Sequence, residues 1–244
     1  MYSGGDAALK KTEATFMNLK EKIIRYLRNQ GESEEEIAED FSCTVNIAMS
    51  LAYYAHRKQQ RENGTPYFFH PLRVCNLYRR FVGITNDFFC IDVDLMYEHE
   101  IPFEGVQEVC LMHDVSEDTE ITVEEIRELF SNEGYESYFD LYIRAPLLAV
   151  THHKKPYESY ESYIRRVLQN RAAALVKMMD LIDNCNPLDL TSWSEKELNR
   201  TLRYVGYIDV IEKKYRFLER AHAYRAKKAL CDKEDLQNKS ENEK

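Results

Sequence analysis

Apolar side chains recur along this sequence at the three- and four-residue spacing of amphipathic helices, and the alternation typical of β-strands is hard to find. The first such segment, residues 9–29, places Leu19, Ile23 and Leu27 on one side, and Gly31 ends it. Further helices are predicted at 45–60, 71–82, 103–113, 123–131, 138–151, 159–169 and 171–184, before a long final region bent at Gly206. The pattern therefore predicts an all-α protein.

Helix-start signals support this interpretation. A Ser or Thr followed three residues later by Glu forms a capping box, and this pattern occurs at Ser33/Glu36, Thr122/Glu125 and Ser194/Glu197. Pro71 suits the first turn of a helix, where its missing N–H costs nothing. His70 would then be the residue that caps that helix. Residues 83–102 give no readable pattern.

Composition narrows the class of protein. The 244 residues are 44% hydrophobic and 31% charged, enough for a folded core, and the formal net charge is -9. An acidic chain is a poor general nucleic-acid binder, because phosphates require a basic face. No apolar run approaches the roughly 20 residues of a membrane span. The six cysteines form no C-x-x-C pair, which favours reduced thiols and a cytoplasmic location.

The candidate chemistry centres on His113 and Asp114, which are followed one helical turn later by Glu117 and Asp118. An imidazole beside carboxylates suits a divalent metal such as Mn, Fe or Zn. The adjoining pattern predicts a buried helix that carries this pair to a cavity.

Two other segments supply partners. His70 precedes a predicted helix, and Asp180 lies among Val176, Met179 and Ile182 at helical spacing. A carboxylate in apolar surroundings is costly unless it is paired, by a metal or by a neighbouring Arg or backbone group. We therefore expect His70, His113, Asp114 and Asp180 to bind one divalent metal.

These segments resemble the HD-domain metal-dependent phosphohydrolases, which share the order H…HD…D. The longer sequence motifs around these residues resemble one branch of that family, the hydrolase domains of RelA/SpoT-type enzymes and small alarmone hydrolases. The matching blocks are Gln59 to Tyr67, His70-Pro71, His113 to Thr119 and Val176 to Asn184. The resemblance covers roughly residues 45–215 and implies a helical HD bundle. We expect residues 1–40 to form an N-terminal helical extension, 41–231 the HD domain and 232–244 a disordered charged tail.

The resemblance also implies roles by position. The four metal ligands match, with Mn²⁺ favoured and Fe²⁺ or Zn²⁺ as alternatives. Glu117 and Asp118 match the catalytic acidic pair, Arg61 an arginine at the guanine-nucleotide pocket, and Asn184 an asparagine near the ribose. The implied activity is removal of the 3′-pyrophosphate from guanosine-3′,5′-bis(diphosphate), ppGpp. We expect Tyr67 to stack on a base, and Lys154, Lys155 and Lys177 to bind substrate phosphates.

Three positions depart from the family wording: Glu62, Asp183 and Asn186 stand where basic or aromatic residues are usual. Hydrolysis of another nucleoside mono- or triphosphate is therefore an alternative, as is a catalytically silent domain that senses a nucleotide. The expected partner is a small nucleotide, with no nucleic acid and no membrane. Pairing of the long C-terminal helix with a second copy, as a homodimer, is a further option.

Overall fold

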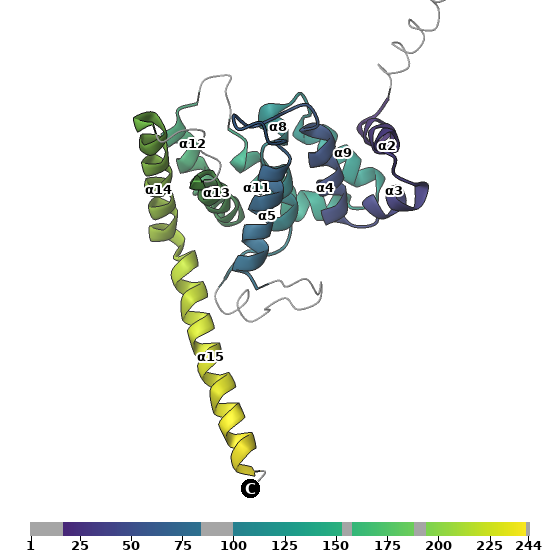
Figure 1. Cartoon of the computed structure of the whole chain (residues 1–244). Helices are drawn as coiled ribbons and strands as arrows, with labels where there is room; N and C mark the ends of the chain where they lie inside the picture. Colours follow the sequence, from purple (N-terminus) through teal and green to yellow (C-terminus); the bar gives the residue numbers. More distant parts are fainter. Residues whose placement is uncertain (1–16, 84–99, 153–157, 188–193, 243–244) are drawn as a thin grey trace, which may run out of the picture.

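The computed structural model describes residues 17–83, 100–152, 158–187 and 194–242, and these residues form helices joined by short loops (Figure 1). Within these ranges there is no β-strand, only an isolated bridge between Gln60 and Pro66. The all-α prediction is confirmed. In the described ranges, no helix combines the length and the apolar character that crossing a bilayer requires.

The elements follow one another with short connections. They are α2 (Leu19–Gln30), α3 (Glu34–Asp40), α4 (Thr44–Ala55), α5 (Phe69–Phe81), α7 (Val106–Met112), α8 (Val115–Asp118), α9 (Val123–Asn132), α10 (Glu136–Tyr138), the π-helix η1 (Phe139–Ile143), α11 (Arg144–Val150), α12 (Tyr160–Val167), α13 (Arg171–Asn184), α14 (Glu195–Tyr215) and α15 (Phe217–Asn242).

Three of these helices form the centre of the protein. α5, α7 and α13 pack against one another, while α4 covers α7 and α14 covers α13. α7 is buried on nearly all sides, as its apolar sequence predicts; Val106, Val109 and Leu111 have no exposed surface. In Figure 1, α2 and α3 lie at one end of the bundle, and α15 extends away from it at the other. The central helices are therefore held from several sides.

Local hydrogen bonds account for several helix starts. The reciprocal capping boxes predicted at Ser33/Glu36 and Thr122/Glu125 both form. At Ser194 only one arm forms, from Glu197 N to the serine Oγ. Helix α13 has the predicted bounds, because the Asn170 side chain caps its first turn. The serine and threonine caps span three residues, which is why the sequence alone predicts them.

The start of α5 corrects one prediction. The helix begins at Phe69, so His70 lies within its first turn instead of capping it. Backbone bonds from Phe69 N to Pro66 O and from His70 N to Tyr67 O wind the preceding segment into turns that run into the helix. This extension places the imidazole on a rigid helical face.

The final helical region also differs from expectation. Gly206 lies inside α14, and the break falls at Arg216, whose φ of 54° is left-handed. The carboxylate of Glu212 accepts hydrogen bonds from Leu218 N and Glu219 N and so caps the next helix. The backbone of α15 is helical as far as Asn242, so the segment from Asp232 is not the disordered tail we expected. Its Lys, Glu, Gln and Leu residues are good helix formers.

Glu108 is a buried carboxyl group in this core, with 3% of its surface exposed. Its Oε1 accepts a 2.5 Å hydrogen bond from Thr44 Oγ1. Burial raises the pKa of the Glu108 carboxyl. The folded state therefore binds this proton more tightly than the unfolded chain. Its contribution to stability is fully present at low pH and is lost as the pH rises through the raised pKa.

We therefore expect Glu108→Gln to stabilise the protein at pH 8, since it removes the charge and keeps an acceptor for Thr44. The advantage in Tm should shrink as the pH falls and the native carboxyl takes up its proton. In a chain of this size about 2–4 °C corresponds to 1 kcal/mol. Glu128→Gln, at an exposed position on α9, is the control. A Tm difference that does not change with pH would contradict the prediction.

Candidate metal centre and nucleotide cavity

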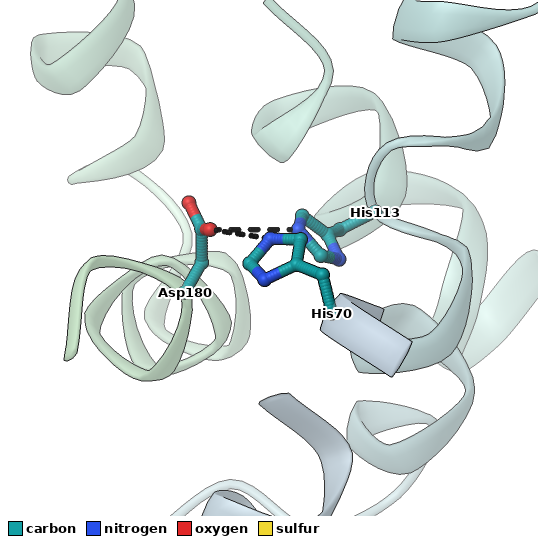
Figure 2. A group of neighbouring side chains, drawn as sticks. All are labelled: His70, His113 and Asp180. Atoms are coloured by element: carbon teal, nitrogen blue, oxygen red, sulfur yellow. Dashed lines mark ion pairs between the residues drawn. The ribbon is translucent and has the colours of Figure 1, made fainter. Parts of the chain in front are cut away.

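Three buried side chains meet at the junction of α5, α7 and α13 (Figure 2). His70 lies in the first turn of α5, His113 directly follows α7, and Asp180 lies within α13. One ligand atom from each lies within 4.8 Å of the other two. Because the three helices pack on one another in the core, their packing fixes this group in place.

The distances between these atoms suit a shared metal ion. His70 Nε2 and His113 Nε2 lie 3.0 and 3.7 Å from Asp180 Oδ1. Asp114, between α7 and α8, places Oδ2 3.1 Å from His113 Nε2 and 3.5 Å from His70 Nε2. Neighbouring ligands bound at about 2.1 Å lie roughly 3.0–3.4 Å apart in octahedral or tetrahedral sites. His70, His113 and Asp180 therefore form one compact group, and Asp114 contacts both of its histidines.

The histidine tautomers agree with this arrangement. His113 Nδ1 donates 2.8 Å to Cys110 O, which leaves the lone pair on Nε2. That Nε2 is buried and has no hydrogen-bond partner among the described residues. His70 Nδ1 is 2.7 Å from Asp183 Oδ2, so the His70 Nε2 lone pair also faces the group. A buried nitrogen without a partner is unfavourable, and a metal ion would satisfy it.

The charges of the group favour a cation. Burial lowers the pKa of the His113 imidazole, but Asp114 and Asp180 outweigh this effect and hold the pKa well above its usual value. Burial raises the pKa of the Asp180 carboxyl, yet Lys177 and the two imidazoles hold it well below its usual range. Two ionised carboxylates thus attract positive charge here. Protons and a metal would compete for this site, because His ligands bind metal in their neutral form.

Surrounding residues hold both carboxylates in place. Tyr67 Oη donates 2.7 Å to Asp114 Oδ2. Lys177 Nζ donates 2.6 Å to Asp180 Oδ2, and Asn184 Nδ2 donates 2.5 Å to Asp180 Oδ1. Lys177, which we expected to bind a phosphate, is therefore paired with a candidate metal ligand. Contacts of this kind orient ligands and tune metal affinity.

A polar cavity of about 230 Å³ opens beside the metal group. Glu117 and Asp118 line it, as predicted for the acidic pair. Glu117 Oε2 accepts a 3.0 Å hydrogen bond from His152 N. The other lining residues are Tyr67, His70, Asp114, His152, Tyr160, Tyr163, Lys177, Asp180, Leu181, Asn184 and Tyr204. The cavity therefore brings a candidate metal centre and two further carboxylates to the same space.

A second cavity of about 260 Å³ shares part of this lining. It is lined by Gln60, Arg61, Glu62, Tyr67, Asn184, Asn186, Arg200 and Tyr204. Arg61 Nη2 donates 2.5 Å to Asn184 Oδ1, so the predicted nucleotide residues Arg61, Tyr67 and Asn184 do come together. Two departures from the family wording, Glu62 and Asn186, lie here as well. The linings of the two cavities share Tyr67, Asn184 and Tyr204.

Sequence reasoning missed several of these lining residues. Arg200 and Tyr204 lie one turn apart on α14, and Tyr160 and Tyr163 come from α12. None lies within the matched blocks, and the four-residue spacing of Arg200 and Tyr204 was the only available signal. Lys154 and Lys155 lie outside the described residues, so their predicted contact with phosphate stays a prediction.

Comparisons with known proteins point in one direction. No family model matches the chain. A probable ppGpp 3′-pyrophosphohydrolase from Synechocystis is 27% identical over 153 residues, which are 62% of this chain and 17% of that protein. A mouse ppGpp 3′-pyrophosphohydrolase is 27% identical over 170 residues, 66% of this chain and 80% of its own. This chain is similar to the ppGpp hydrolases. It spans most of the mouse protein but only a small part of the cyanobacterial one.

A solved structure, described as "A metazoan ortholog of SpoT hydrolyzes ppGpp and plays a role in starvation responses", also resembles this chain. It has a TM-score of 0.48 and 23% identity, and the match covers 75% of this chain and 96% of that one. The sequence matches agree with the HD-type resemblance of the motif residues.

Proposed function

We propose that this protein is a metal-dependent phosphohydrolase that converts ppGpp to GDP and pyrophosphate. The observation that carries the proposal is the group of His70, His113 and Asp180, with Asp114 in contact with both histidines, beside a cavity that two further carboxylates line. The named activity of the mouse and cyanobacterial relatives supports the choice of substrate. We extend the proposal to the domain limits expected from the sequence, with the HD domain at residues 41–231.

One divalent metal, with Mn²⁺ favoured over Fe²⁺ or Zn²⁺, would be held by the two histidines and two aspartates. When bound, it would supply a Lewis acid that polarises a phosphate oxygen and acidifies water. The site mixes imidazole and carboxylate ligands, which suits all three metals. Metal content measured on protein purified without added metal, followed by reconstitution, tests this choice.

The acidic pair would move the protons. Water attacks the phosphorus attached to the 3′-oxygen of the nucleotide, and the bond from that oxygen to phosphorus breaks. One of Glu117 and Asp118 takes a proton from the attacking water, and a proton returns to the 3′-oxygen of GDP. Both side chains line the cavity beside the metal group, where a bound substrate would come within the hydrogen-bond reach that general acid–base catalysis requires.

The second cavity would hold the nucleoside. Arg61 and Asn184 present polar groups there, and the rings of Tyr67 and Tyr204 line it. Stacking of a base on an aromatic ring is worth about 1–3 kcal/mol. Arg200, one turn before Tyr204 on α14, also lines this cavity. These groups would hold the base and ribose while the 3′-diphosphate lies over the metal.

The decisive experiment is a substrate panel. Purified protein with Mn²⁺ should release GDP and pyrophosphate from ppGpp, and a chelator should abolish the release and added Mn²⁺ restore it. Turnover of a different nucleoside mono- or triphosphate alone would replace the substrate and keep the chemistry. If no nucleotide is turned over although metal is bound, the protein is a nucleotide sensor. A cytoplasmic location and a homodimer stay predictions, to be tested by fractionation and by the mass in solution.

A further inference from the structure

Asp183 is a buried carboxylate that none of the proposed catalytic steps uses. It lies on α13 one turn from Asp180, and 4% of its surface is exposed. Its Oδ2 is 2.7 Å from His70 Nδ1, the ring nitrogen that faces away from the metal group. The sequence analysis singles out this position as a departure from the motif of the related hydrolases.

Two arginines hold the Asp183 carboxylate. Arg73, on α5, donates from Nε at 2.7 Å to Oδ1 and from Nη2 at 3.0 Å to Oδ2, a bidentate pair. Arg61 Nη1 adds a longer contact of 3.4 Å to Oδ2. Planar bidentate pairing fixes a carboxylate in orientation as well as position. The oxygen that faces His70 is therefore fixed between α5 and α13.

We propose that Asp183 is a positioning residue that fixes the tautomer and ring orientation of His70 for metal binding. This inference rests on the proposed metal centre. With Nδ1–H donated to Asp183, the lone pair of His70 remains on Nε2, the atom 3.0 Å from Asp180 Oδ1. A carboxylate behind a metal-bound imidazole also makes the ring a stronger ligand, and loss of such a partner typically weakens metal binding about 10–100-fold.

Arg61 connects this arrangement to the second cavity. Besides its contact with Asp183, it donates to Asn184, which in turn donates to the ligand Asp180. The same guanidinium therefore supports His70 through Asp183 and Asp180 through Asn184. Arg73 contacts the carboxylate from α5 and lines neither of the two cavities at the metal group.

The test is metal affinity, measured by calorimetric titration of the metal-free full chain with Mn²⁺ and with Zn²⁺. Asp183→Asn keeps the size of the side chain and should bind each metal about 10–100-fold more weakly. Asp140→Asn is the matched control, because Asp140 is also held by arginines, Arg127 and Arg144, on α9 and α11. It should bind metal like the wild type. Long-range ¹H–¹⁵N correlations of the Zn²⁺-loaded protein should show His70 protonated at Nδ1 in the wild type.

The outcomes separate this inference from the proposed function. Equal metal affinity of Asp183→Asn and the wild type overturns the positioning role and leaves the metal centre intact. A wild type that binds no metal overturns both. If Asp183→Asn does not fold, as judged by circular dichroism, Arg73→Gln replaces it. That variant keeps Asp183 but removes the bidentate pair that orients its carboxylate, so the metal affinity should fall. Unchanged affinity again overturns the positioning role.

Discussion

Replacing His113 by alanine is expected to abolish metal binding and nucleotide hydrolysis together. The side chain is almost completely buried, and its Nε2 faces three other candidate ligands without a hydrogen bond of its own. A metal centre contributes several kcal/mol to the transition state, and each 1.4 kcal/mol is tenfold in rate. Turnover should therefore fall by at least about 10³, measured as pyrophosphate released from ppGpp.

Thermal unfolding separates loss of the metal from loss of the fold. Ligand at 100 times its Kd stabilises a protein by about 2.7 kcal/mol, which is roughly 5–10 °C for this chain length. Mn²⁺ should raise the Tm of the wild type by this amount and leave that of His113→Ala unchanged. His222→Ala removes an exposed imidazole on α15 and controls for adventitious binding. A Mn²⁺-dependent rise in Tm that survives in His113→Ala contradicts the assignment.

The parts of this structure that the sequence predicts are those fixed by nearby residues. The capping residues and the limits of α13 depend on hydrogen bonds across one turn, and the buried helix before His113 follows from an unbroken apolar run. His70 was predicted to cap α5, but it lies in the first turn of the helix, because turns from Pro66 onward extend α5 toward the N-terminus. Gly206 was a poor guide to the helix break, since a glycine is tolerated within a helix and Glu212 determines the actual position.

The metal group was predictable because each member carries its own local signal. A histidine beside an aspartate, or an aspartate among apolar residues, stands out within a few positions. The cavity walls carry no such signal. Tyr160 and Tyr204 are ordinary helix residues until α12 and α14 pack beside α13. Lys177 looks like a free phosphate ligand in the sequence, and only the fold shows that it is paired with Asp180.

The contact of Asp183 with His70 is another feature that the sequence does not predict. In the sequence it is a missing aromatic residue and therefore weakens the resemblance. In the fold its carboxylate faces the back of His70 and is held by Arg73. The two residues are 113 positions apart, so no local pattern relates them. A departure that removes an expected substrate contact can thus supply a contact to the metal ligand.

Asp118→Asn is expected to lower kcat by about 10²–10⁴, the range in which general acid–base catalysis contributes, and to leave metal affinity unchanged. Asp118 lines the cavity, whereas the convergent ligand atoms belong to His70, His113 and Asp180, with Asp114 in contact with both histidines. Gln59 Nε2 donates 2.9 Å to the Asp118 carbonyl oxygen, so the backbone at this position is held by a second element. The amide keeps the shape of the side chain and cannot carry the proton.

Glu117→Gln should have an effect in the same range, since both carboxylates face the same space. Glu120→Gln, at an exposed position two residues after Asp118, is the control and should retain wild-type kcat. Metal titration of each variant decides between the two chemical roles. If Asp118→Asn loses metal affinity in parallel with kcat, the carboxylate is a ligand; if kcat is unchanged, proton transfer belongs to another group. Loss of kcat with full metal binding assigns proton transfer to Glu117 and Asp118. The same result argues against a catalytically silent sensor, because a sensor has no turnover to lose.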